Sequence, residues 1–292
     1  MKLAYNSNGW RFFPLEAMFT SLAQIGYHAV ELGVQPNHVP PCRWSSKEAQ
    51  RIKGIAADAG LAVSNLHLGA ERLLSDTPHE PSLMSAYQSQ RDQRIDLIRQ
   101  GCDFAAEMGV ALVCLESGPL PPDMSRAAGM GHLIEGVEAC ISHARETGVR
   151  LALEPSPEHL LNGYRAYLEL CQVFGPHPSL GLCLDIGHSH CVFEDTIAIV
   201  AAASDHLFHV HIEDIANREH SHLPLGEGAI DLKAVLSALQ VAGYDGCVSV
   251  ELADHSAAPE SMSRQSHAYL RQLLDDPEPD PSTRRATRRA PR

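Results

Sequence analysis

Residues 133–154 read LIEGVEACISHARETGVRLALE and contain the repeating unit from which the fold is predicted. An amphipathic segment over 133–147 ends at Gly148, and a short apolar run follows over 150–154. Glycine closes helices because it readily adopts the left-handed conformation that a helix end requires. The stretch therefore predicts a helix that is followed directly by a buried strand.

The same alternation recurs along the whole chain. Apolar runs predict further strands over 2–5, 28–32, 62–68, 111–116, 180–185, 207–212 and 247–252, and amphipathic segments predict helices over 14–25, 46–59, 85–108 and 232–242. The runs are nearly continuous in apolar residues, which is typical of parallel strands buried on both faces. Eight such strands alternating with helices predict an α/β fold, a single (β/α)8 TIM barrel over 1–274. An open doubly wound sheet is the alternative.

Charge and composition restrict the partners. The chain has 292 residues and a formal charge of −13, although its last twelve residues contain five arginines and no acidic residue. An acidic body repels polyanions, which disfavours nucleic acid as the main partner. Residues 275–292 are rich in proline and arginine, so we expect a disordered tail, with contact to RNA, a membrane or an acidic neighbour as the alternative.

The cysteines and the N-terminus indicate a reducing compartment. Eight cysteines form no C-x-x-C pair, and several lie in apolar runs such as GVALVCL (109–115), where cysteine behaves as a small buried hydrophobe. The chain turns polar at Asn6, too early for a signal peptide, and holds no apolar stretch of roughly 18 residues. We expect a cytoplasmic protein without a membrane partner. The sequence leaves open whether it forms a homo-oligomer.

Polar residues stand at the carboxyl ends of all eight predicted strands. They are Asn6, Glu31, His67, Glu116, Glu154, Asp185, His211 and Glu251. Strand ends converge on one face of a barrel, and burying so many carboxylates and imidazoles is costly unless a cation or hydrogen bonds compensate. Three carboxylates and one imidazole on the last four strands favour one Mn²⁺, Mg²⁺ or Co²⁺ ion and tolerate Zn²⁺. The alternative is a set of ordinary polar residues at a barrel mouth.

Four motifs resemble those of the xylose isomerase-like TIM barrel superfamily. They are LDIGH (184–188), HVHIED (209–214), LGEGAID (225–231) and SVEL (249–252). That group contains sugar isomerases, ketose 3-epimerases, inosose and dehydroshikimate dehydratases, and metal-dependent abasic-site endonucleases. The resemblance implies that the metal ligands are Glu154, Asp185, His211 and Glu251.

The resemblance also suggests residues around the metal. His188 matches a residue that contacts a substrate oxygen, and Arg218 resembles a substrate-contacting arginine of ketose epimerases, though at a different spacing. His67 and His222 match positions that bind extra metals in the endonuclease branch. Where that branch has a histidine and an aspartate, this chain has Glu116 and His220, so further metal sites stay open. We also expect His67 and Glu116 to contact substrate.

Several other residues permit two interpretations. Glu158 is either a proton-handling partner in the site or a solvated loop acid, and Phe12 and Phe13 either line a substrate pocket or pack under a loop. His38, His143 and His177 show no ligand spacing and are predicted to be surface residues.

The resemblance implies an isomerase or epimerase that acts on a sugar, keto-sugar or cyclitol through an enediolate. Glu154 and Glu251 would be the acid/base pair, and His188 would stabilise the developing oxyanion. A lyase acting through the same enediolate, an endonuclease-type phosphodiesterase and a non-catalytic sugar-binding barrel are the alternatives. The sequence names no substrate, because specificity is expected in the loops over 35–44 and 71–85.

Overall fold

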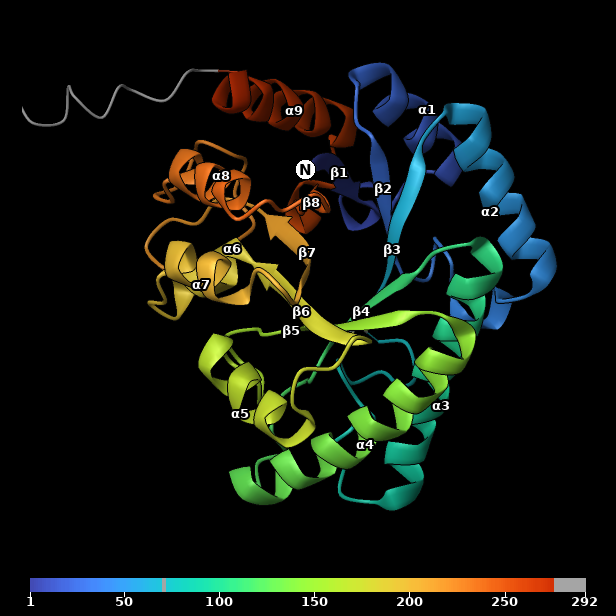
Figure 1. Ribbon diagram of the computed structural model, residues 1–292. Helices are drawn as coiled ribbons and strands as arrows, with labels where there is room; N and C mark the ends of the chain where they lie inside the picture. Colours follow the sequence, from blue (N-terminus) through green and yellow to red (C-terminus); the bar gives the residue numbers. More distant parts are fainter. Residues whose placement is uncertain (70–71, 276–292) are drawn as a thin grey trace, which may run out of the picture.

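A computed structural model describes residues 1–69 and 72–275 as one closed barrel of eight parallel strands (Figure 1). The strands are β1 (Lys2–Asn6), β2 (Ala29–Gly33), β3 (Ala62–Leu68), β4 (Leu112–Glu116), β5 (Arg150–Glu154), β6 (Leu180–Asp185), β7 (Leu207–Ile212) and β8 (Cys247–Val250). Because β1 pairs with both β2 and β8, the sheet has no edge, so the predicted barrel is confirmed and the open sheet is excluded. The predicted tail lies outside the described residues, except for residue 275.

Helices surround the barrel on its outside (Figure 1). They are α1 (Leu15–Ile25), α2 (Ser46–Ala59), α3 (Gln88–Met108), α4 (Arg126–Thr147), α5 (Tyr164–Phe174), α6 (Ile186–Cys191), α7 (Thr196–Ala203), α8 (Leu232–Val241) and α9 (Pro259–Asp275), with short 3-10 turns η1 (Ser7–Trp10), η2 (Pro41–Arg43) and η3 (Ala253–His255). Among the described residues, none of these helices is both long and apolar enough to cross a membrane.

The helix α4 begins earlier than predicted, at residue 126 rather than 133. The Ser125 hydroxyl accepts a hydrogen bond from the Ala128 amide (3.2 Å) and caps the first turn. Its other end was predicted correctly: Gly148 has a φ of 73° and the Val149 amide bonds back to Ala144. The helix therefore begins at its serine cap, ahead of the amphipathic segment from which it was predicted.

The interior of the barrel changes from apolar to polar along the strands. Side chains alternate between the faces of a strand, so residues two apart point the same way. Cys114, Ala152 and Cys183 pack in one small apolar cluster. Two residues further along the same strands stand Glu116, Glu154 and Asp185. The polar strand ends therefore form a layer on top of an apolar plug.

Candidate metal centre

The structure brings together the four residues predicted as metal ligands. Glu154 and Asp185 end β5 and β6, His211 lies on β7 and Glu251 follows β8 directly. His211 Nδ1 lies 3.1 Å from Glu154 Oε1, 3.0 Å from Glu251 Oε2 and 3.8 Å from Asp185 Oδ2. One ligand atom from each residue lies within 4.8 Å of all the others, and all four side chains are buried. We call this set the quartet.

The donor atoms of the quartet fit a divalent cation. Metal–oxygen bonds of 2.0–2.1 Å place adjacent ligands of an octahedral ion roughly 3 Å apart, close to the two shorter distances at His211. Within the described chain, Asp185 Oδ2 is buried without a hydrogen-bond partner, while Asp185 Oδ1 accepts from the His188 amide (2.7 Å). A buried carboxylate oxygen without a partner is costly, and a cation would offset that cost.

The acidic and imidazole groups of the quartet polarise one another. Burial alone would raise the pKa of Glu154, but the adjoining His211 and His67 hold it well below its ordinary value. Burial likewise opposes ionisation of Glu251, yet His211 lowers its pKa to about 2. Burial would lower the pKa of His211, and the surrounding acidic groups, Cys183, Glu31 and Glu154 foremost, raise it well above 6.5. The floor of the site therefore favours ionised carboxylates next to a protonated imidazole.

A buried carboxylate on the other half of the barrel orients His211. Glu31 lies 2.9 Å and 3.0 Å, through its two oxygens, from His211 Nε2, and 3.1 Å from His209 Nε2. Asn65 Nδ2 also donates to Glu31 Oε1 (2.8 Å). Because a carboxylate only accepts, His211 carries a proton on Nε2, and in a neutral ring Nδ1 then presents a lone pair to the quartet. From the sequence, Glu31 could either shape the floor of the pocket or be a structural hydrogen bonder at the end of its strand.

Asn8 is a site residue that sequence reasoning missed. Its Nδ2 donates to Glu251 Oε1 (2.6 Å), which leaves Glu251 Oε2 facing His211. The backbone N–H of Asn8 donates to Asn6 Oδ1 (3.0 Å), so the side chain of the last β1 residue fixes the turn that carries Asn8. The signal in the sequence was the polar run NSN (6–8) immediately after a buried strand.

Histidines surround the quartet. His188 Nδ1 donates to the Pro155 carbonyl (3.0 Å), and its Nε2 lies 3.0 Å from His220 Nε2. His67 Nε2 lies 3.1 Å from Glu154 Oε2. His222 Nδ1 contacts the fully buried Glu213, a residue that the sequence analysis did not select.

A cavity of about 200 Å³ opens above the quartet. The described residues that line it include Glu154, Glu251 and His188 and also the predicted His67 and Glu116, but neither lysine nor arginine. The structure does not bring Arg218 or Glu158 to this cavity. Both are exposed, and the Arg218 guanidinium stacks over Phe193 at 4.0 Å and bonds to the His190 carbonyl.

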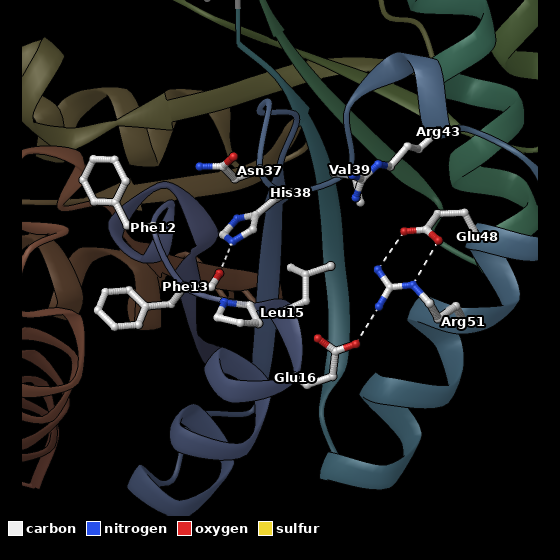
Figure 2. Close-up of a pocket in the computed structure, with 11 residues that line it drawn as sticks. Phe12, Phe13, Leu15, Glu16, Asn37, His38, Val39, Arg43, Glu48 and Arg51 are labelled. Atoms are coloured by element: carbon white, nitrogen blue, oxygen red, sulfur yellow. Dashed lines mark hydrogen bonds and ion pairs between the residues drawn. The ribbon is translucent and has the colours of Figure 1, made fainter.

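A separate cavity of about 410 Å³ is lined by the segment after η1, the start of α1, the loop after β2 and α2 (Figure 2). Its described lining includes Phe12 and Phe13 and has no residue in common with the cavity above the quartet. The prediction that His38 is a surface residue was wrong: it is 1% exposed, and its Nε2 bonds to the Phe13 carbonyl (2.8 Å; Figure 2). The loop after β2 folds back against the loop after β1, a contact that residue spacing does not reveal.

Comparison with known proteins identifies the family of this chain. The family model described as xylose isomerase-like TIM barrel matches residues 19–273. The chain belongs to the xylose isomerase-like TIM barrel family. The resemblance that the four motifs indicated is thereby confirmed.

Relatives within this family include sugar epimerases. The L-ribulose-5-phosphate 3-epimerase UlaE of Salmonella paratyphi A is 24% identical over 252 residues, 82% of this chain and 84% of that protein. The fructoselysine 3-epimerase of Escherichia coli O157:H7 is 23% identical over 286 residues, 95% and 100% of the two chains. The structure of the IolI protein with a bound zinc atom superposes with a TM-score of 0.78 at 18% identity, covering 94% and 98%.

Proposed function

We propose that this family member is a divalent-metal-dependent sugar epimerase, which inverts a carbon next to a carbonyl group. The observation that carries the proposal is the placement of two buried carboxylates, Glu154 and Glu251, about one imidazole nitrogen at the floor of a cavity. The two epimerases named above match most of this chain and support epimerisation, whereas an inosose dehydratase of Lacticaseibacillus casei, a lyase by its name, matches 50% of it.

Glu154, Asp185, His211 and Glu251 would hold the ion, and Glu31 would keep His211 Nδ1 available for it. When bound, a divalent cation polarises a carbonyl or hydroxyl oxygen and thereby acidifies the neighbouring C–H. The mostly oxygen donor set favours Mn²⁺, Mg²⁺ or Co²⁺, and Zn²⁺ is tolerated.

The carboxylates of the site would move the proton. One of Glu154 and Glu251 removes it from the carbon next to the carbonyl, and the other returns it from the opposite side of the resulting enediolate. Asn8 holds one oxygen of Glu251 through its amide and so fixes the direction of the other. His188 lines the cavity and is anchored through Nδ1 to the Pro155 carbonyl, and its Nε2, which lies beside His220, would stabilise developing negative charge when it carries a proton.

The lining of the cavity favours an uncharged sugar. Phosphate groups are usually bound by arginine, lysine or helix N-termini, and the described residues of the cavity contain neither basic type. Asn8, Gln35 and Glu116 instead offer partners for hydroxyl groups. We therefore propose an unphosphorylated ketose or keto-sugar as the substrate.

Proton exchange would test this function directly. The protein loaded with Mn²⁺ is incubated in D₂O with unphosphorylated ketoses, keto-glycosides and cyclitols, and with ketose phosphates in parallel. Deuterium at a carbon beside the carbonyl, together with inversion there, is the expected NMR result. Loss of water detected by mass would instead identify a lyase, and turnover confined to the phosphates would contradict the uncharged substrate.

Two variants would test the acid/base assignment. Glu154→Gln and Glu251→Gln should each lower turnover by roughly 10²- to 10⁴-fold, the range typical of general acid–base catalysis. The exposed Glu146→Gln serves as the matched control. A Glu251→Gln protein that keeps its metal and its full turnover would refute the role given to Glu251.

A further inference from the structure

A second cluster of histidines and a carboxylate lies next to the quartet. His79, Glu116 and His159 each offer one ligand atom within 4.8 Å of the other two, and we call them the loop triad. His79 Nδ1 and His159 Nδ1 lie 3.7 Å and 3.9 Å from Glu116 Oε2, and the two rings meet edge to face at 4.6 Å. Glu116 pairs in register with Glu154, so the two clusters adjoin.

The atoms that face one another in the loop triad lack ordinary partners. Within the described residues, His79 Nδ1 and His159 Nδ1 are buried and accept or donate no hydrogen bond. Burial lowers the pKa of both rings, that of His159 to about 4, so both are uncharged at neutral pH. Burial and the neighbouring Glu154 also raise the pKa of Glu116. A cation between the three side chains would give the two buried Nδ1 atoms a partner.

Hydrogen bonds to its backbone hold the loop that carries His79 in place. The buried Arg94 donates to the His79 carbonyl (3.2 Å) and to the Pro81 carbonyl (2.7 Å). His79 has a φ of 64°, an unfavourable conformation for a residue with a side chain, and such strain gathers at functional positions.

The loop that carries His159 is fixed to the end of β4. The Leu160 amide donates to the Gly118 carbonyl (3.0 Å), and the Leu161 amide donates to the Ser117 hydroxyl (3.1 Å). Residues 117 and 118 follow Glu116 directly. The backbone on both sides of the loop triad is thus preorganised, as a ligand site requires.

We propose that the loop triad is a second metal site, which binds Zn²⁺ through the two Nδ1 atoms and the Glu116 carboxylate. Zinc–ligand bonds of 2.0–2.2 Å separate tetrahedral ligands by roughly 3.4 Å, so the two measured separations need to close by only a few tenths of an ångström. This site goes beyond the proposed function, since it requires no sugar. It shares Glu116 with the positions that the endonuclease branch suggests, whereas His79 and His159 lie outside that set.

The donor set distinguishes the loop triad from the quartet. Two imidazoles and one carboxylate favour Zn²⁺, whereas three carboxylates and one imidazole favour harder ions such as Mn²⁺. His79 and Glu116 line the cavity above the quartet, so the remaining coordination positions of a zinc ion would be reached from that cavity. The second ion would therefore offer a second anchor for a substrate oxygen.

Counting zinc ions would test the second site without any substrate. The full chain is stripped with a chelator, dialysed to equilibrium against Zn²⁺ alone, and analysed for zinc per chain. His159→Gln and His79→Asn should each bind one zinc ion fewer than the wild type. Asparagine is chosen at position 79 because it tolerates a positive φ. His143→Gln removes a partly exposed imidazole that pairs with Asp103, and it should bind as many ions as the wild type.

Equal zinc content in His159→Gln and the wild type would overturn the second site. Because a loop variant can fail to fold, zinc-edge anomalous diffraction from zinc-soaked crystals of the wild type provides an independent measurement. A peak between His79, Glu116 and His159 supports the proposal, and its absence there overturns it. Neither measurement depends on turnover, so failure of the proposed epimerase would leave the result interpretable.

Discussion

The two halves of the barrel contribute to the centre in different ways. Strands β5 to β8 supply the quartet, whose atoms face one another across the cavity floor. Strands β1 to β3 supply Glu31, Asn65 and, just beyond β1, Asn8, which act on the quartet through hydrogen bonds. One half thus presents the candidate ligands and the other orients them, which predicts a graded series of mutational effects.

The largest effect is expected in the half that presents ligands. Asp185→Asn should remove the ion, because Asp185 Oδ2 is buried and has no hydrogen-bond partner among the described residues. Loss of metal activation is worth several kcal/mol, on the order of a thousandfold in rate. Metal content by atomic emission and turnover in added Mn²⁺ measure it, with the exposed Asp58→Asn as the control. An Asp185→Asn protein with the metal affinity of the wild type would contradict the claim that strands β5 to β8 present the ligands.

A smaller effect is expected from the orienting half. Glu31→Gln should weaken Mn²⁺ binding by roughly 10- to 100-fold, the usual cost of losing a carboxylate behind a histidine ligand. The new amide would also point donor groups at His209 or His211, which already donate there. Mn²⁺ titration followed by electron paramagnetic resonance would measure the affinity, and Glu146→Gln is again the control. An unchanged affinity would show that Glu31 does not support the site.

Asn8 should affect turnover more than metal binding. Asn8→Ala removes the amide that holds Glu251 Oε1, a hydrogen bond to a charged group, so kcat is expected to fall roughly tenfold. Affinity for Mn²⁺ should change little, because Glu251 Oε2 remains in place. A parallel fall of both quantities would place Asn8 with the ligands rather than with the orienting residues.

The smallest effect is expected far from the centre, on the orienting half. Arg51 pairs with Glu16 (2.6 Å) and Glu48 (2.7 Å) beside the cavity of Figure 2, where its side chain is 41% exposed. Exposed ion pairs contribute little, so Arg51→Gln should lower the free energy of unfolding by less than about 1 kcal/mol. Urea denaturation would measure this change, and turnover should stay at the wild-type rate. A larger loss of stability would show that the ion pair contributes more than exposed pairs do, and slower turnover would show that this cavity is coupled to the centre.

The fold and the candidate ligands could be predicted because their signals are local. Glycine at position 148 and the apolar run after it predicted a helix end and a strand, and a polar residue at each strand end predicted a polar face. Residues two apart on a strand share a face, so the side chains that face the interior can be assigned from the sequence. Glu154, Asp185 and His211 lie at or next to the ends of neighbouring strands, and closure of the barrel brings them together. Whether they bind an ion stays a prediction.

Only the tertiary structure decided which loops meet and in which direction their side chains point. Asn8 reaches Glu251 across 243 residues of sequence, His38 is buried by a neighbouring loop, and Arg218 turns toward Phe193 instead of the cavity. The physical reason is that backbone periodicity and glycine conformation act over a few residues, whereas loop contacts depend on surfaces that come together when the barrel closes.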